Sequence, residues 1–308
     1  MPKVKFVFLI LPEVHLLDLA GPAQVISEAI DLGADLEIEH AGVRESIRTS
    51  AGLGITGLKP FTNVDIRKGD FLVIPGSRVG YIRSAAFRQN TELFRWLRLA
   101  HANRVNLVSI CVGAFTLAEA GLLDGLPCTT HFKLTESLQR QFPLLKVKEN
   151  VLFVSEGTVH TSAGIASGID LMLSLLEQLT DSYFAHKVAR ELVVYNRRTG
   201  MSGQISAYFN HRNHVHHGIH TVQDRIIEHV AKKHQLHELA SIACMSERNF
   251  TRLFKKETGV TVKEYITQIR LEKIKELLKD PDLSPSQMAR KVGLGSSKQL
   301  ERLLRKIG

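Results

Sequence analysis

Residues 3–195 alternate short apolar runs with longer segments in which apolar residues recur every three or four positions. The short runs predict buried β-strands, and the longer segments predict amphipathic helices. We expect strands at residues 3–11, 36–43, 70–74 and 105–110, and helices at 22–30, 91–101, 112–120, 133–141, 165–179 and 181–193. Strands and helices in alternation predict an α/β fold, in which helices cover both faces of a parallel sheet. Ligands bind such sheets beyond the C-terminal ends of the strands.

From residue 222 onward the pattern is helical almost throughout, which predicts a second, all-α domain. We therefore divide the chain into an α/β domain at 1–196, a linker at 197–220 and a helical domain at 221–308. The linker is basic and contains five histidines: His211, His214, His216, His217 and His220. Crowded histidines can bind a metal ion, but these lack a cysteine or acidic residue to complete the ligand set. We expect a polar, basic tether and no metal.

The helical domain contains an internal repeat. Residues 239–246 predict a short helix and a tight turn, and residues 247–256 predict a second helix, for which Ser246 is a suitable N-cap. At 100° per residue, Phe250, Leu253 and Phe254 share one face of that second helix. The opposite face and its flanks carry the candidate DNA-contacting residues, which are Ser246, Arg248, Asn249, Thr251, Arg252, Lys255 and Lys256. An apolar face toward the core and a basic face outward are typical of a recognition helix in the major groove.

The same arrangement returns fifty residues later, in residues 289–306. Leucines take the apolar positions, and the second set of candidate DNA-contacting residues consists of Ser297, Lys298, Gln299, Arg302 and Arg305. Between the two copies, residues 262–278 predict one helix of about 25 Å at 1.5 Å per residue. Such a helix could place the two recognition helices about 34 Å apart, which is one turn of DNA.

The net charge of +9 is concentrated in the C-terminal third. Residues 1–196 carry 19 basic and 20 acidic residues, residues 197–220 carry three basic and no acidic ones, and residues 221–308 carry 18 basic and 11 acidic ones. A basic domain attached to a neutral one indicates a polyanionic partner for the basic domain alone. RNA is disfavoured because the domain lacks the aromatic stacking residues of RNA-binding modules.

Residues 222 to the end resemble the AraC/XylS family of transcription regulators. The matching residues are Leu239-Ala240, Met245-Ser246, Phe250-x-Arg252-x-Phe254-Lys255 and Gly293-Leu294-x-Ser296. The resemblance implies two helix-turn-helix motifs that bind double-stranded promoter DNA, with RNA polymerase as a further candidate partner. Family members usually continue beyond the position of Gly308 with a short capping segment. We therefore expect the second motif to be less stable, and the first to dominate DNA affinity.

The α/β domain has a candidate pocket around Cys111. The strand at 105–110 runs through Cys111 directly into a helix, and such a strand-to-helix turn resembles a nucleophile elbow. Its backbone N–H groups would lower the pKa of a thiol and could bind an oxyanion, with Gly76 as a second donor. Asp18 follows the first strand and His131 follows a short strand at 127–130, so both could converge beside the thiol.

Residues 3–195 resemble the class I glutamine-amidotransferase-like (PfpI) superfamily, whose fold is a flavodoxin-like parallel sheet. The matching motifs are Leu17-Asp18-x-Ala20-Gly21-Pro22, Cys111-x-Gly113-Ala114-Phe115, Gly121-Leu122-Leu123-Asp124-Gly125, Thr129-Thr130-His131 and Thr161-Ser162-Ala163-Gly164. By this resemblance Cys111 matches the reactive cysteine, and Asp18 matches the acidic residue of isonitrile-hydratase-like members. Protease-like members carry histidine after the cysteine, whereas this chain carries Val112, which cannot act as a base.

Two functions remain open. The first is a transcription regulator whose α/β domain binds a small metabolite, because fused regulators of the superfamily sense amino acids or amines and commonly pair as homodimers. The second is a cysteine-dependent hydratase or amidase that carries a DNA-binding domain; Val112 favours the regulator, and we expect no enzyme activity and no cofactor. No apolar run reaches the roughly 18 residues of a membrane span. Three widely spaced cysteines, Cys111, Cys128 and Cys244, indicate a reducing cytoplasm.

Overall fold

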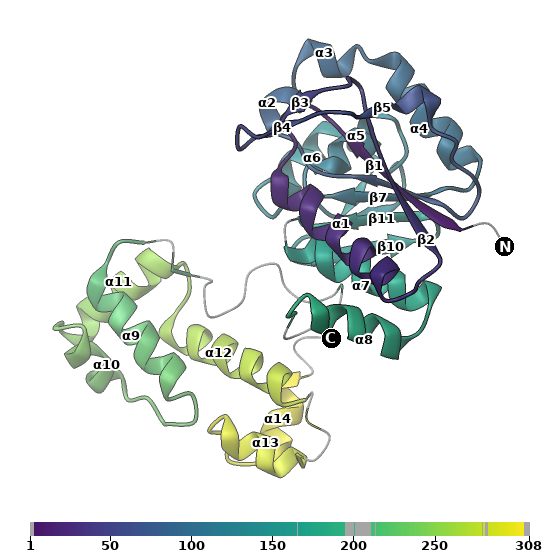
Figure 1. The fold of residues 1–308 in the computed structure, drawn as a ribbon. Coiled ribbons are helices and arrows are strands. Elements are labelled where there is room, and N and C mark those ends of the chain that lie inside the picture. The colour runs from purple at the N-terminus through teal and green to yellow at the C-terminus, as the bar shows by residue number, and fades with distance from the viewer. Residues whose placement is uncertain are drawn as a thin grey trace. The chain divides into compact units, whose positions relative to one another are not determined.

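A computed structural model describes residues 3–164, 166–194, 200, 211, 212, 214–278, 280 and 283–304 of the chain (Figure 1). The chain divides into two compact units, Met1–Gln204 and Ile205–Gly308. The first is an α/β unit, and the second is helical, so the predicted α/β fold followed by an all-α domain with two helix-turn-helix motifs is confirmed.

A seven-stranded sheet forms the centre of the first unit, in the order β10-β11-β7-β6-β1-β2-β5. Its strands are β1 (Val4–Ile10), β2 (Leu36–Gly42), β5 (Lys59–Pro60), β6 (Phe71–Ile74), β7 (Asn106–Ile110), β10 (Phe153–Glu156) and β11 (Val159–Ser162). All pairs are parallel except β10 with β11. The inner strands β1, β6 and β7 are almost wholly buried, as expected for strands covered on both faces. Stacked rings of Phe6 and Phe71, 4.5 Å apart, join β1 to β6.

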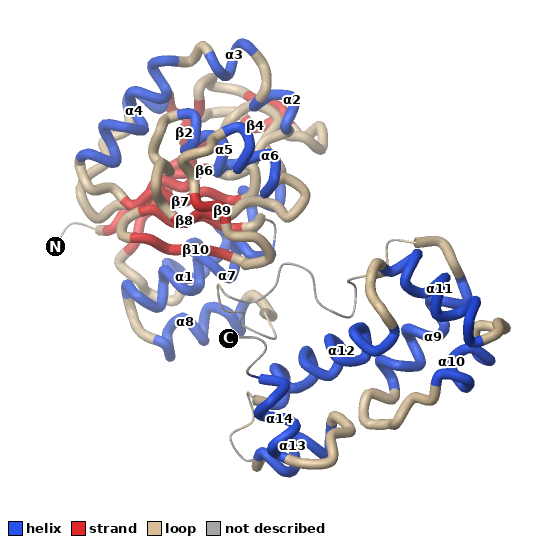
Figure 2. The backbone as a smooth tube through the Cα atoms, turned by 180° about the vertical axis from the view of Figure 1, so that it is seen from behind, coloured by secondary structure: helices blue, strands red, loops and turns tan. Residues whose placement is uncertain are grey.

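Helices cover both faces of this sheet (Figure 2). Helices α1 (Leu16–Asp31), α7 (Ala166–Leu179) and α8 (Ser182–Glu191) pack together on one face. Helices α4 (Thr91–Ala102) and α5 (Gly113–Glu119) lie on the other face. The remaining elements are β3 (Ile47–Arg48), β4 (Gly54–Ile55), a 3-10 turn at Phe61–Asn63, α2 (Val79–Ile82), α3 (Ala85–Arg88), β8 (Pro127–Cys128), α6 (Thr135–Gln141) and β9 (Lys146–Val147).

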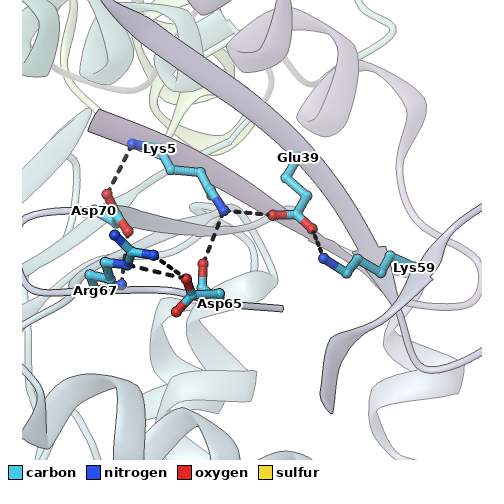
Figure 3. A network of polar contacts seen from close by, with 6 residues as sticks. All are labelled: Lys5, Glu39, Lys59, Asp65, Arg67 and Asp70. Carbon is cyan, nitrogen blue, oxygen red and sulfur yellow. Dashed lines mark hydrogen bonds and ion pairs between the residues drawn. The ribbon is translucent and has the colours of Figure 1, made fainter. Parts of the chain in front are cut away.

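An ionic network ties the strands together near the amino-terminal end of the sheet (Figure 3). The ammonium group of Lys5 contacts Glu39 at 3.1 Å, and Glu39 in turn contacts Lys59 at 2.6 Å. The backbone N–H groups of Lys5 and Arg67 donate to the two oxygens of Asp70. Although burial alone would raise the pKa of Glu39, the hydrogen bonds from the two lysines hold it below its ordinary value. The network thus holds together the amino-terminal ends of the strands, and Cys111 follows the opposite, carboxyl-terminal end of β7.

The structure corrects two expectations for this unit. The first helix begins at Leu16 and not at residue 22, because Pro22 is accommodated inside the helix, and Asp18 therefore lies in the first helical turn. Strands β10 and β11 were not expected, because the buried residues of β11 include His160, Thr161 and Ser162, which give no apolar run. Their hairpin adds an antiparallel edge to a sheet that was expected to be parallel throughout.

The second unit contains six helices in its described part. These are α9 (His217–Glu228), α10 (Leu236–Ile242), α11 (Glu247–Thr258), α12 (Val262–Leu277), α13 (Pro285–Lys291) and α14 (Ser297–Leu304). Two separate apolar cores form around α11 and α14, and α12 contributes to both. With 16 residues, α12 is about 24 Å long, close to the expected length.

The expected linker at 197–220 overlaps the helical unit at its end. Helix α9 already begins at His217, with His216 as its N-cap. The ring of His211 bonds the carbonyl of Thr258 at 2.7 Å and the side chain of Gln268 at 2.8 Å, and Arg212 contacts Asp224 at 2.6 Å. These contacts show that His211 and Arg212 are held on the helical unit. Residues 201–210 lie outside the described residues.

The repeat is less regular than its sequence suggested. Up to the turn, the second motif follows the first by 49 residues, so that Ala240 corresponds to Ala289 and Cys244 to Gly293. After the turn the offset is 50, because Ser246 and Ser296 are both bonded by the backbone N–H three residues on. The turn of the second motif therefore contains one additional residue, Gly295.

Candidate functional site

Cys111 lies at the turn between β7 and α5, in the left-handed backbone conformation with φ 55°. This conformation costs a residue with a side chain about 1–2 kcal/mol, so neighbouring groups must hold it. The N–H of Cys111 donates to the carbonyl of Ser162 at 2.9 Å, and the hydroxyl of Thr130 donates to the carbonyl of Cys111 at 2.8 Å. The segments that contain Thr130 and Ser162 thus both bond the backbone of Cys111, and these two hydrogen bonds help to hold its conformation.

Two glycines allow the elbow to pack closely against its neighbours. A Cβ atom at Gly76 would lie 2.6 Å from Oδ2 of Asp18 and 3.1 Å from Cβ of Cys111. A Cβ atom at Gly164, where φ is 107°, would lie 2.7 Å from the sulfur of Cys111. Gly113 likewise has no room for a side chain beside the carbonyl of Ile74. The structure therefore brings Asp18, Gly76 and Gly164 into direct contact with the turn.

The thiol of Cys111 is buried and lies beside a buried carboxyl group. Cys111 is 5% exposed, and Asp18 is fully buried. Burial raises the pKa of the Cys111 thiol, and the charge of Asp18 raises it further; a backbone hydrogen bond from Val112 acts in the opposite direction, and a hydrogen bond with the carboxyl group of Asp18 raises the pKa again. We expected the turn to lower this pKa, and that expectation is wrong, because burial and Asp18 outweigh the backbone. The thiol is held neutral, and a neutral thiol is a poor nucleophile.

His131 lies near this site but has other partners. Its ring packs against that of Phe132 at 4.6 Å and accepts a hydrogen bond from the backbone of Lys133. Burial lowers the pKa of His131, and the charges of Lys133 and His15 lower it further. His15, which sequence reasoning missed, is the N-cap residue of α1, and its N–H donates to the carbonyl of Gly76 at 2.7 Å. Val112 is 3% exposed.

The second candidate site is the outer face of α11. Phe250 and Phe254 are fully buried, and Ser246 caps the helix by accepting a hydrogen bond from the backbone of Asn249. All seven candidate residues of this motif are exposed: Ser246, Arg248, Asn249, Thr251, Arg252, Lys255 and Lys256. Four basic residues among them line an open groove, together with Leu236, Glu247 and Thr251. This surface can accept a polyanion.

The corresponding face of α14 is smaller in its described part. Lys298, Gln299 and Arg302 are exposed, whereas Ser297 is half-buried. Leu300 anchors the helix in the second core, and Arg305 lies outside the described residues. The amide oxygen of Gln299 accepts a hydrogen bond from the backbone of Gly295 at 3.0 Å, so this oxygen already has a partner within the protein.

Over the described residues, no three side chains among histidine, cysteine, aspartate and glutamate are placed to bind one metal ion. Within the same part of the chain, no helix combines the length and apolarity that crossing a membrane needs.

The chain belongs to the DJ-1/PfpI family, whose model matches residues 4–178. A helix-turn-helix domain model matches residues 239–307, and this domain is of the AraC type. The combination defines a transcription regulator with a DNA-binding helix-turn-helix domain attached to a DJ-1/PfpI domain. Both resemblances noted in the sequence are thereby confirmed.

Known relatives agree with this organisation. The chain is 28% identical over 308 residues to the HTH-type transcriptional regulator CdhR of Pseudomonas aeruginosa, covering 97% of this chain and 88% of that protein. An isonitrile hydratase of Pseudomonas putida is 29% identical over 187 residues, covering 60% of this chain and 76% of that enzyme. The crystal structure of an AraC family transcriptional regulator from Pseudomonas putida has a TM-score of 0.53 and 21% identity, covering 62% of this chain and all of that one. CdhR matches nearly the whole chain and is a regulator, whereas the match to the hydratase covers 60% of this chain.

The raised pKa of Cys111 predicts a slow reaction with iodoacetamide. In the native protein, Cys111 should be alkylated at least about tenfold more slowly than the exposed Cys244, because the thiolate is the reacting species. Its rate should stay low from pH 7 to 9, since the thiol still holds its proton there. Asp18→Asn removes the charge that opposes the thiolate, and should speed alkylation. Peptide mass spectrometry measures each rate; Cys111 reacting as fast as Cys244 would show that the thiol is activated.

Proposed function

We propose that this protein is a sequence-specific transcription regulator that reads promoter DNA chiefly with α11 and responds to a small metabolite bound near Cys111. The observation that carries the proposal is the division of α11 into a buried aromatic face and an exposed basic one. A recognition helix needs both, because the first fixes its position and the second meets phosphates and base edges. Arg252 is already oriented, since it donates to the side chain of Asn249 at 3.0 Å.

The proposed metabolite site is supported by the buried polar groups at the carboxyl-terminal ends of the strands. Asp18 and Cys111 lie there together, and the α/β architecture places ligands at this edge. The neighbouring hydroxyl groups of Ser77 and Ser162 are fully buried, and the described residues give neither oxygen a hydrogen-bond partner. Polar groups of this kind recognise a small polar molecule when the site opens.

An enzyme of the hydratase or amidase type is the second candidate. The partial likeness to an isonitrile hydratase favours it, and the sequence resemblance implies that Asp18, which lies beside Cys111, matches the acidic residue of such enzymes. The buried, neutral thiol and the absence of a base at Val112 favour a sensor. A homodimer, RNA polymerase as a partner and a cytoplasmic location stay predictions.

Replacing Arg248 or Arg252 by alanine should weaken binding to duplexes selected from a random library by about 1–3 kcal/mol each, if these residues reach base edges. Lys298→Ala and Arg302→Ala should cost less, because the described core that holds α14 has fewer buried residues than the core that holds α11. Arg140→Ala, which removes the same charge from an exposed position of the first unit, is the matched control and should have no effect. Fluorescence anisotropy measures each affinity. Unchanged binding in both α11 variants would rule out this docking mode.

A metabolite that binds near Cys111 should raise the unfolding temperature of the first unit. Trp96 is the only tryptophan and lies in α4, so its fluorescence reports this unit alone. We propose a thermal-shift screen of amino acids, amines and betaines on the full chain. A compound that stabilises the wild type should lose its effect in Asp18→Asn and Cys111→Ala. Stabilisation that survives both substitutions would place the ligand elsewhere, and turnover of isonitriles or amides that Cys111→Ala abolishes would favour the enzyme.

A further inference from the structure

The turn of the second helix-turn-helix motif touches the backbone of the first. Gly293 lies in this turn, between α13 and α14, with φ 71°. A Cβ atom at Gly293 would lie 2.7 Å from the carbonyl carbon of Ala231 and even closer to its oxygen. Ala231 belongs to the loop at 229–235 between α9 and α10, which is part of the first motif's unit. The nearest atoms are backbone atoms, so no side-chain rotation could make room.

The geometry of the turn does not by itself require glycine. Cys244 holds the corresponding position of the first motif, with φ 56°. Its N–H donates to the carbonyl three residues back, and the next N–H donates to the carbonyl five residues back; Gly293 and Leu294 make the same two bonds. Both turns are therefore Schellman motifs, and one of them carries a side chain at the left-handed residue. The close approach to Ala231 is what makes glycine necessary at position 293.

The same loop is also bonded by α12. The guanidinium group of Arg270 donates to the carbonyl of Val230 at 3.4 Å and to that of Lys232 at 3.2 Å. The two carbonyl groups that flank Ala231 are thus bound by the helix that joins the two motifs. We call Ala231, Arg270 and Gly293 the joint, because the loop at 229–235, α12 and the turn between α13 and α14 meet at these residues.

We propose that the joint fixes the second recognition helix relative to the first, so that one chain reads two DNA boxes at a single spacing. The two motifs have separate apolar cores, and α12 contributes residues to both. The joint is a second connection between the motifs, in addition to α12. Two rigidly connected readers bind a matching pair of boxes far more tightly than either box alone. This inference rests on the proposed reading of DNA, but its structural half can be tested without DNA.

Hydrogen exchange of the full chain tests the structural half. Gly293→Ala should speed exchange at residues 229–235 by at least about tenfold, although these residues are some 60 positions away in the sequence. Gly295→Ala is the matched control, because its Cβ atom would meet nothing closer than 3.8 Å and no left-handed φ is involved; it should leave that loop unchanged. Gly293→Asn tolerates the left-handed conformation better than alanine but keeps the clash, so it should act like Gly293→Ala. Faster exchange confined to α13 and α14 would overturn the joint.

Duplexes selected from a random library by the full chain test the functional half. Wild type should select two boxes at one spacing, and inserting about five base pairs, half a helical turn, should weaken its binding by about tenfold or more. Gly293→Ala should weaken binding to the unaltered pair and be nearly insensitive to the insertion, whereas Gly295→Ala should behave like wild type. Tolerance of the insertion by wild type would overturn the fixed spacing. If wild type selects no duplex at all, the proposed function fails as well, while the exchange experiment still decides whether the joint exists.

Discussion

The packing of Phe250 and Phe254 around Tyr265 decides which side of α11 faces solvent. The rings of Phe250 and Phe254 are 5.7 Å apart, and those of Phe254 and Tyr265 are 5.6 Å apart, all three in edge-on arrangements. Each of the three side chains is fully buried, and they are the largest side chains of the first motif's core. Since Phe250 and Phe254 share one face of α11, Arg248, Arg252 and Lys255 point outward. His211 adds to this core through its ring and bonds the C-terminal end of α11.

The candidate site of the first unit has the opposite arrangement, because its polar groups are buried, whereas the basic groups of α11 are exposed. The turn at Cys111 has a left-handed φ of 55°, and Asp18, Gly76 and Gly164 close around the thiol, whose pKa is raised by burial and by the charge of Asp18. A catalytic cysteine needs its thiolate, and this surrounding stabilises the thiol instead. The same close packing means that any bound molecule must displace or reorder its neighbours. Such a change is what a sensor requires, because a ligand can shift a protein only by binding two states differently.

Much of this organisation could be predicted from the sequence. Strands β1, β6 and β7 gave apolar runs because both of their faces are buried, and the opposed faces of α11 were visible from the spacing of Phe250, Phe254 and the basic residues. Strand β11 could not be found in this way, because its buried side chains are polar and are held by tertiary contacts such as that of Thr161 with the backbone of Thr129. The raised pKa of Cys111 and the need for glycine at position 293 also depend on residues distant in sequence, Asp18 and Ala231, which no local pattern reveals.

The central claim is that the basic face of α11 binds the phosphates and bases of duplex DNA. Its most direct test is the salt dependence of binding between the full chain and a selected duplex. Each neutralised phosphate releases counterions, so the logarithm of the binding constant should fall linearly with the logarithm of salt concentration, with a slope of about −0.9 per phosphate neutralised. We predict a steep negative slope, and replacing a basic residue of α11 that binds a phosphate should make it shallower by about one such unit. A slope near zero, unaffected by these substitutions, would contradict the claim.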